Sequence, residues 1–529
     1  MKQIVKAAFL ITVFSVATRA VGFLYRIFLS RTLGAEGMGI LQVALSVFGV
    51  LVTFTSSGLP VTVSRLTARS GRDPAEGDRI VTSAALLGLS VAGVLALLLF
   101  LFREQLGFLF SDGRCLPVFT ALLPAFLASA LYSACRGGLW GNKSFLSYSL
   151  VEFCEEAAMV AAGVIFLQGV DLLTDKTLNA ARAVTVSYLT AAVLTVVLYL
   201  RRGKFRRCGK EQFLPLLKGA APITAVRLLG CLLGSAVAIL MPQRLTAAGM
   251  TPAEALSLYG VMSGMVMPLL FLPGTVTGSI ALVLVPEVSV TSQKKDKAAL
   301  NQNLSDSLNF SLLVACIILC GYLSCGSSFA SALYENPEAG RLLTVSAGLM
   351  IPMTLSQLSS TIMNSLGLES RVMRHFALGA ACMLGSVILL PSLIGIYAIV
   401  VGNLLQLTLS AVLNLRVIRR QSGLRMDFLK NGLRCLLLGI PAGCLGRMTA
   451  ELLSHFLPAL LASGIGLGIA VGSLALLCCL FGLLDLGLLL RRGQGKPPTE
   501  EKKPSLFRRL KANGKRGLLR KAPAPKSGS

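Results

Sequence analysis

The stretch Thr12–Arg31, TVFSVATRAVGFLYRIFLSR, is apolar and, at about 20 residues, long enough to cross a bilayer as a helix. It nevertheless carries Arg19 and Arg26 inside the apolar run. Because they are seven residues apart, they lie on nearly the same face of a helix. Arginines in membranes usually face a bundle interior or a watery cavity, so we interpret this stretch as a membrane helix with one cationic face. The alternative is that both side chains extend to opposite interfaces, which suits Arg26 better than the mid-span Arg19.

The composition indicates an integral membrane protein. The chain has 529 residues, of which 54% are hydrophobic and only 14% charged. No cleavage site follows the first apolar run, so we expect no cleaved signal peptide. The two histidines and the 13 scattered cysteines show no metal-ligand spacing. We therefore expect no metal site, no cofactor and no catalytic constellation, and a transporter rather than an enzyme.

Hydropathy predicts an all-α polytopic fold with about fourteen transmembrane helices. Two features support six-helix lobes: Arg227 and Gly230 repeat the spacing of Arg19 and Gly22, and the fourth and tenth spans end in similar Gly- and Ser-containing turns. We predict an N-lobe at 1–205, a C-lobe at 206–425, two added helices at 426–490 and a basic tail at 491–529. The predicted spans are 7–29, 40–62, 80–102, 116–136, 147–168, 182–200, 219–241, 256–285, 308–330, 342–365, 373–391, 394–415, 433–453 and 459–490.

The net charge of +26 is distributed by membrane side. The N-terminus and the loops after even-numbered spans are rich in Lys and Arg, as in Arg201–Lys210, whereas the other loops are poor in them. The positive-inside rule therefore predicts a multi-pass protein of the bacterial cytoplasmic membrane with both termini cytoplasmic. This distribution argues against nucleic acid as a partner.

Residues 491–529 carry 13 basic and two acidic residues and are rich in Pro and Gly, so most of this tail is expected to be disordered. Leu506, Phe507 and Leu510 predict a short helix lying on anionic lipid. An unstructured tail that only sets orientation is the equal alternative.

Polar stripes at helical spacing mark candidate ligand-binding faces on several spans. Gln42 begins one on the second span, Glu152 lies on the fifth, Arg227 on the seventh and Asn364 on the tenth. For the neutral residues the alternative is interhelical hydrogen bonding, worth roughly 0.6 kcal/mol per contact. For the arginines we favour a binding role, with Glu152 as counter-ion or proton site. A purely structural Arg–Glu pair remains open.

Arg19, Arg26 and Arg227 facing one cleft would form a site for an anion, because guanidinium suits phosphate. In a membrane, an isoprenoid-linked diphosphate glycolipid is a natural ligand. An anion leaving a negative-inside cell gains about 2.3 kcal/mol per charge per 100 mV, which favours export. We expect Na⁺, H⁺ or the membrane potential to drive it, and a monomer.

Several motifs resemble the family of stage V sporulation protein B and its polysaccharide-export relatives. They are the opening TRAVGFLYRIFLSRTLGAEGMGILQVA, then SSGLPVTVSRLTA, Arg136-Gly137, Asn364-Ser-Leu-Gly367 and AAGMTPAEALSLYGVMSGMVMPLLFLP. The superfamily also contains the lipid II flippases and the multidrug and toxin extruders. The resemblance implies a fourteen-helix, two-lobe fold and alternating-access export of undecaprenyl-diphosphate-linked sugars or peptidoglycan precursor.

The sequence departs from the family pattern at several positions. Arg19 matches a flippase substrate-binding arginine, whereas Arg26 is displaced by one residue and fits the sporulation subfamily better. Gly264 and its two successors stand where a flippase has an arginine in the eighth span, and Arg227 is a possible substitute. Glu156 stands where relatives tend to have arginine.

Three rival functions stay open. A cation-coupled multidrug-type antiporter of the same fold would use acidic residues at its centre, and Glu152, Glu155 and Glu156 supply them. A membrane glycan-processing enzyme would need acidic residues or histidine in a substantial outer loop, and the outer loops are short. A non-transporting scaffold has no use for arginines within the membrane.

Overall fold

The computed structural model describes residues 2–70, 73–272, 274, 297–423 and 427–484. Over these residues it consists of helices and turns, with no strand. Twelve of the described helices are long and apolar enough to cross a membrane. The predicted all-α polytopic membrane fold is confirmed.

The chain divides into two compact units, which we describe separately. Unit 1 comprises residues 1–268 and 380–402, and unit 2 comprises residues 269–379 and 403–529. The predicted boundary at 205/206 lies inside unit 1. This division follows compactness, whereas the predicted lobes follow an internal repeat, so the six-plus-six arrangement remains a prediction.

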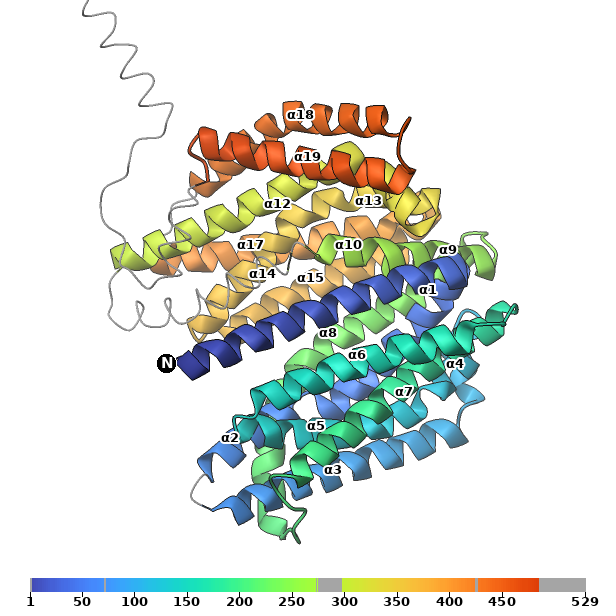
Figure 1. Cartoon of the computed structure of the whole chain (residues 1–529), viewed down its shortest axis with the longest axis vertical. Coiled ribbons are helices and arrows are strands. Elements are labelled where there is room, and N and C mark those ends of the chain that lie inside the picture. The colour runs from blue at the N-terminus through green and yellow to red at the C-terminus, as the bar shows by residue number, and fades with distance from the viewer. Residues whose placement is uncertain (1, 71–72, 273, 275–296, 424–426, 485–529) are drawn as a thin grey trace, which may run out of the picture. The chain divides into compact units, whose positions relative to one another are not determined.

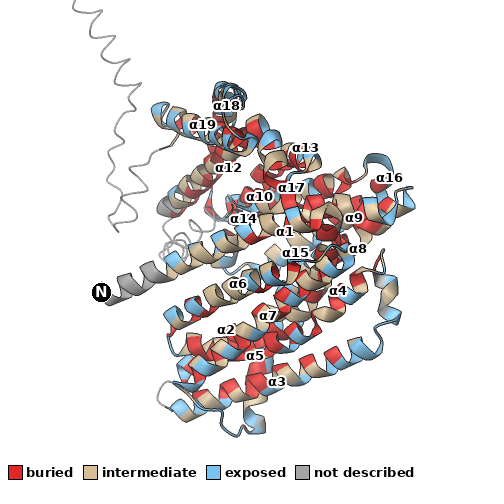
Figure 2. Ribbon diagram, turned by 45° about the vertical axis from the view of Figure 1, so that its right-hand side comes forward, coloured by how far each residue is buried: buried red, intermediate tan, exposed pale blue. Residues whose placement is uncertain are grey.

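Unit 1 is built from long helices that run side by side (Figure 1). The most buried of them is α5, and the outer side of α3 is exposed (Figure 2). The elements are α1 (Lys2–Ser56), α2 (Leu59–Arg69), α3 (Pro74–Leu101), α4 (Cys115–Ala121), α5 (Leu123–Gly141), α6 (Phe145–Leu167), α7 (Leu173–Leu200), α8 (Phe213–Ala247), α9 (Pro252–Gly260), a π-helix (Val261–Val266), and α16 (Pro391–Ile394), together with short 3-10 turns at Gln105–Leu109 and Lys210–Gln212.

The first predicted span and most of the second form the single long helix α1, which is broken at Gly34, and the second span ends in α2. Gly34 has a φ of 68°, in the left-handed region that favours glycine. The chain bends at this residue, and helical structure continues on both sides of it. The second half of α1 then packs backbone to backbone against α9. A side chain on Gly39 would collide with the carbonyl of Leu256, and one on Gly260 with that of Ala35.

Polar contacts tie the turns of unit 1 together at each end. Arg114, before α4, pairs with Asp112 at 2.6 Å and with Glu36, just after the break in α1, at 2.5 Å. Burial alone would raise the pKa of Asp112, but hydrogen bonds and the charge of Arg114 outweigh it and lower that pKa. Asp78, in the first turns of α3, holds the α7–α8 connection: it accepts from the amide of Lys204 at 3.0 Å.

Unit 2 has one apolar core, formed by leucines on one face of α12 and by residues of α14, α17, α18 and α19. Leu304, Leu308 and Leu312 recur every four residues along α12, as expected for a buried helix face. Its elements are α12 (Lys297–Tyr334), α13 (Pro337–Ser346), α14 (Met350–Ser365), α18 (Asp427–Leu453) and α19 (Ala459–Leu480). Helices α10 (Met267–Phe271), α15 (Glu369–Leu389) and α17 (Tyr397–Ser422) each contribute residues to both units.

The predicted number of fourteen spans differs from the twelve helices counted by length and composition. One of the twelve, Val13–Arg69, covers all of the second predicted span and most of the first. Helix α6 coincides with the predicted span 147–168 but carries three glutamates, more charge than that count allows. The number fourteen remains a prediction. Residues 275–285 and 485–490 of two predicted spans, and the tail 491–529, lie outside the described residues.

Candidate functional site

Helix α1 lies against α6 in unit 1, and small residues allow the close approach. The carboxylate of Glu156 lies against Gly22, and the ring of Tyr25 covers Gly163. Phe14 and Phe153 pack edge to face with ring centroids 5.9 Å apart. The helix that carries Arg19 and Arg26 therefore faces the helix that carries the three glutamates.

This contact brings opposite charges together. Glu152 interacts electrostatically with both Arg19 and Arg136, and Glu156 interacts with Arg26. The Arg136 Nη2 to Glu152 Oε1 distance is 3.9 Å. Arg19 is exposed, whereas Arg26 is half-buried. Paired charges of this kind satisfy the requirement that an ionised group within a membrane-spanning segment have a partner.

Arg136 of α5 is held by aromatic rings. Its guanidinium carbon lies 4.5 Å from the ring centroids of both Trp140 and Tyr148, and 5.8 Å from that of Tyr132. The Tyr148 hydroxyl donates a hydrogen bond to Glu152. The Nε of Arg136 is buried and makes no hydrogen bond within the described part of the chain. Cation–π contacts and Glu152 together fix this side chain.

Glu155 completes the cluster, since it interacts with Tyr132 and Arg136. We call Arg19, Arg26, Arg136, Glu152, Glu155 and Glu156 the charged cluster. Its three arginines and three glutamates balance when all are ionised. An anion that binds in the cluster must therefore compete with the glutamates for the arginines. A cation that binds there must compete with the arginines for the glutamates.

The other predicted site residues lie elsewhere. Gln42, on the second half of α1, faces Gly264 of the π-helix: a Cβ on Gly264 would lie 3.6 Å from Gln42 Cγ and 2.7 Å from the methyl carbon of Met38. The position where the resemblance expected an arginine is thus closely packed. Asn364 is exposed at the end of α14 in unit 2, where its carbonyl accepts from the amide of Gly367 at 3.1 Å.

Arg227 of α8 binds the break between α1 and α2. It donates from Nη1 to the Ser57 carbonyl at 3.0 Å. Ser57 lies between the end of α1 at Ser56 and the start of α2 at Leu59, where the regular helical hydrogen bonds are interrupted. Arg227 therefore compensates a broken helix. Arg19 and Glu152 lie together in the charged cluster with Arg26, whereas the hydrogen bond of Arg227 among the described residues goes to Ser57.

Arg136 is the member of the cluster that the sequence analysis did not select as a site residue. A signal for it was present, because Tyr132, Arg136 and Trp140 recur every four residues and so share one face of a helix. An arginine between two aromatic residues at this spacing indicates a cation held by rings.

Unit 2 contains a polar cluster at Asn414 that has no carboxylate and no arginine. The Asn414 side chain is buried; its Oδ1 lies 2.7 Å from His375 Nδ1, and its Nδ2 donates to Ser360 Oγ at 3.0 Å and Ser359 Oγ at 3.3 Å. We call these four residues the neutral cluster. Among the described residues, no group of three or more His, Cys, Asp or Glu is arranged to hold a metal ion.

Comparisons with known proteins agree with this architecture. The family model described as polysaccharide biosynthesis protein matches residues 4–292, more than half of the chain. The chain is 26% identical over 407 residues to stage V sporulation protein B of Bacillus subtilis (strain 168), covering 73% of this chain and 77% of that protein. It is 24% identical over 384 residues to the uncharacterized membrane protein YabM of the same organism, covering 68% and 70%.

Two solved structures share the fold. The lipid II flippase MurJ matches with a TM-score of 0.64 at 14% identity, covering 88% of this chain and 99% of that one. An inward-facing multidrug resistance MATE transporter of the MOP superfamily matches with a TM-score of 0.62 at 13% identity, covering 77% and 94%. The resemblance noted from the motifs is confirmed.

Proposed function

Because this chain belongs to the polysaccharide biosynthesis protein family and has the fold of MOP-superfamily transporters, we propose that it exports an undecaprenyl-diphosphate-linked precursor. The cargo would be a cell-wall precursor or oligosaccharide, moved from the inner to the outer leaflet by alternating access. The name of its structural neighbour, a lipid II flippase, and that of its family both support a lipid-linked glycan as the substrate.

The observation that carries the proposal is the pair of α1 arginines facing α6. Arg19 is exposed, so its planar guanidinium can offer two parallel N–H donors to a phosphate oxygen pair. A diphosphate brings more negative charge than the Glu152 carboxylate and competes for Arg19. When the headgroup leaves, Glu152 again partners Arg19 and the empty site stays neutral. Gln42, Asn364 and Arg227 remain candidate contacts, with Arg227 expected to contribute less because it already donates to Ser57.

Transport needs a driving force but no cofactor in this proposal. Outward movement of an anion down a negative-inside potential gains about 2.3 kcal/mol per charge per 100 mV. Coupling to Na⁺ or H⁺ could add to it. We also propose a monomer in the bacterial cytoplasmic membrane with both termini cytoplasmic, and contact of the basic tail with anionic lipid.

The glutamates of the charged cluster favour a second candidate, a cation-coupled antiporter. Glu152, Glu155 and Glu156 lie on one helix, and a MATE transporter shares the fold. An organic cation or coupling ion would then displace the arginines from the carboxylates. The two candidate functions differ in the charge of the ligand that the cluster would bind: negative for the flippase and positive for the antiporter.

The test is binding of lipid II and of undecaprenyl diphosphate to the purified protein by native mass spectrometry. The wild type is compared with Arg19→Ala and Arg26→Ala, and Arg227→Ala serves as the matched arginine control. We expect binding to fall in the first two variants and largely to persist in the third. Binding that is absent from the wild type, or indifferent to Arg19 and Arg26, would reject the flippase and leave the antiporter to be tested with Glu152→Gln.

A further inference from the structure

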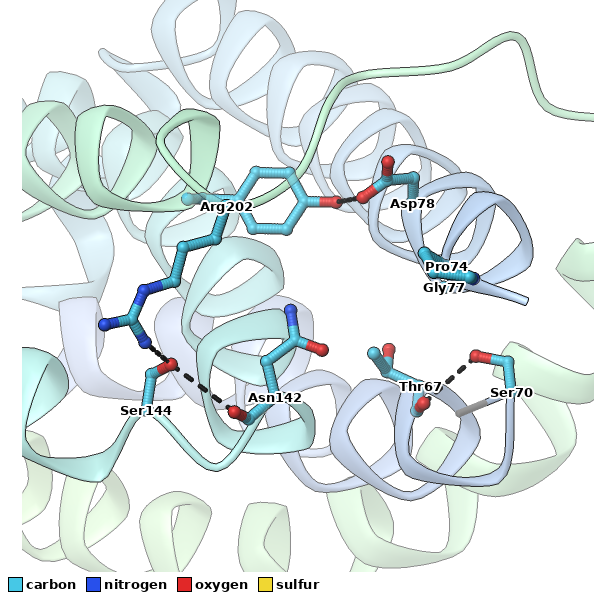
Figure 3. A pocket seen from close by; sticks show the side chains of 9 residues that line it. Thr67, Ser70, Pro74, Gly77, Asp78, Asn142, Ser144 and Arg202 are labelled. Carbon is cyan, nitrogen blue, oxygen red and sulfur yellow. Dashed lines mark hydrogen bonds between the residues drawn. The ribbon is translucent and has the colours of Figure 1, made fainter. Parts of the chain in front are cut away.

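Unit 1 has a polar pocket at the helix ends, outside the charged cluster. It has a volume of 290 Å³ and lies where the α2–α3 turn, the α5–α6 turn and the end of α7 meet (Figure 3). Its lining includes Thr67, Asp78, Asn142, Tyr199 and Arg202. The proposed function makes no use of it.

The negative charge in this pocket is already satisfied. Asp78 accepts from the Tyr199 hydroxyl at 2.7 Å and from the Lys204 amide at 3.0 Å, and its carboxylate lies 3.6 Å from the Nε of Arg206. Only 13% of the Asp78 side chain is exposed. A carboxylate with three such partners is a structural anchor of the α7–α8 connection and repels an incoming anion little.

The groups left over in the pocket are mainly donors. Arg202 donates one N–H to Ser144 and has four more. The Thr67 side chain is 7% exposed, and its hydroxyl is buried without a hydrogen-bond partner within the described residues. In Figure 3 this hydroxyl and the amide of Asn142 point toward the space between α2 and Arg202. A buried hydroxyl without a partner costs free energy, which a ligand oxygen would recover.

The position of the pocket restricts the class of ligand that it can bind. The apolar helices α3, α5 and α7 all begin or end at this pocket, so it lies at the boundary between hydrocarbon and water. The adjoining segment contains Arg201, Lys204, Arg206 and Arg207 besides Arg202. Basic residues at this depth attract anionic lipid. They disfavour a headgroup that carries an ammonium.

We propose that this pocket binds the phosphodiester of an anionic phospholipid headgroup. Arg202 supplies the positive charge of the lining, and no carboxylate among the described residues forms an ion pair with it, which suits the single negative charge of a phosphodiester. Thr67 and Asn142 supply neutral donors to its oxygens. Free phosphate has the same chemistry, so the experiment separates the two sources.

The experiment uses the full-length protein in detergent and native mass spectrometry. Phosphatidylglycerol and phosphatidylethanolamine with identical acyl chains are added in turn, with and without inorganic phosphate. The variant is Arg202→Gln, and the matched control is Arg201→Gln, the preceding arginine, which does not line the pocket. Thr67→Val, a change of nearly constant volume, is the second variant, and thermal unfolding verifies that each variant folds.

We expect phosphatidylglycerol to be retained in preference to phosphatidylethanolamine by the wild type and by Arg201→Gln. Retention should fall about tenfold in Arg202→Gln and less in Thr67→Val, as expected for a charged and a neutral hydrogen bond. Equal losses in Arg201→Gln and Arg202→Gln, or equal retention of both lipids, would overturn the proposal. Displacement of the lipid by inorganic phosphate that itself remains bound would overturn the lipid as source and assign the pocket to free phosphate.

Discussion

The charged cluster of unit 1 and the neutral cluster of unit 2 solve the same physical problem in different ways. Both place polar side chains within predominantly apolar helices. Asn414 does so with neutral partners at 2.7 to 3.3 Å and is buried. Arg19 and Arg26 do so with full charges against carboxylates, and Arg19 stays exposed.

This difference between the clusters indicates which of them serves helix packing and which serves ligand binding. A neutral hydrogen bond between membrane helices contributes roughly 0.6 kcal/mol, enough to favour one packing over another. An ion pair costs more to bury and is a poor choice if packing is its only role. We infer that the neutral cluster holds unit 2 together, and that the charged cluster is retained because a ligand uses it.

The largest expected effect tests that inference directly. Arg19→Ala should lower binding of undecaprenyl diphosphate on the order of tenfold or more, because it removes a charged donor. The same substitution also removes one of the two arginines that interact with the Glu152 carboxylate. The double variant Arg19→Ala with Glu152→Gln removes that imbalance, and should recover thermal stability without recovering binding. Thermal unfolding and native mass spectrometry on the same samples measure both.

A double variant that regained both stability and binding would make the Arg19–Glu152 interaction purely structural. The comparison between the clusters would then lose its basis, since both would serve packing alone.

The next effect concerns the neutral cluster. Asn414→Leu should destabilise the protein by about 1–3 kcal/mol, because His375 and two serines lose a buried partner. Binding of undecaprenyl diphosphate should stay near the wild-type value. Ser360→Ala removes one of these bonds and should have a smaller effect on the unfolding temperature. A loss of binding at unchanged stability in Asn414→Leu would assign ligand contact to unit 2 as well.

A smaller effect is expected at the aromatic rings around Arg136. Trp140→Phe keeps an aromatic ring but weakens the cation–π contact that now has a distance of 4.5 Å. We expect a loss of about 0.5–1 kcal/mol in the free energy of unfolding. The same substitution in an Arg136→Gln background should cost less, because no cation remains. Equal costs in the two backgrounds would show that Trp140 acts by packing alone.

The smallest effect concerns charges outside the spans, at Asp112 and Arg114. Because the folded protein lowers the pKa of Asp112, this pair adds stability above the ordinary aspartate value of 3.8, and that stability is lost as the pH falls through the lowered value. Asp112→Asn should therefore lower the unfolding temperature at neutral pH. The difference in unfolding temperature between Asp112→Asn and the wild type should shrink as the pH falls below 3.8. A difference that stays constant with pH would mean that the carboxylate charge is not responsible.

Much of the fold could be predicted because hydropathy and length are properties of each segment alone. The predicted spans 80–102 and 182–200, for example, end within one residue of α3 and α7, although both helices begin earlier, at Pro74 and Leu173. The continuation of helix across Gly34 was harder to predict: we expected a loop between the spans 7–29 and 40–62, whereas helical structure resumes directly after the break. The π-helix at Val261–Val266 likewise has no local signal, since it reflects packing against the second half of α1.

The candidate site was predictable only in part. The seven-residue spacing of Arg19 and Arg26 indicated a shared face, and Glu152 was a natural partner. Hydropathy does not say which helix faces which, so the pairing of Arg26 with Glu156 and the inclusion of Arg136 required the structure. Arg227 was grouped with them because its motif repeats that of Arg19, whereas its hydrogen bond depends on a helix break that no repeat encodes.

The three glutamates of α6 have a consequence for how the chain is made. Each acidic side chain at a helix centre disfavours entry into the bilayer by about 3 kcal/mol, so α6 is a poor candidate for insertion alone. Its partners Arg19, Arg26 and Arg136 all precede it in the chain and are synthesised first. We therefore expect insertion of α6 to depend on α1 and α5, which precede it in the chain. In a glycosylation-reporter assay, α6 should insert efficiently behind the native α1–α5 segment and poorly behind one that lacks the arginines.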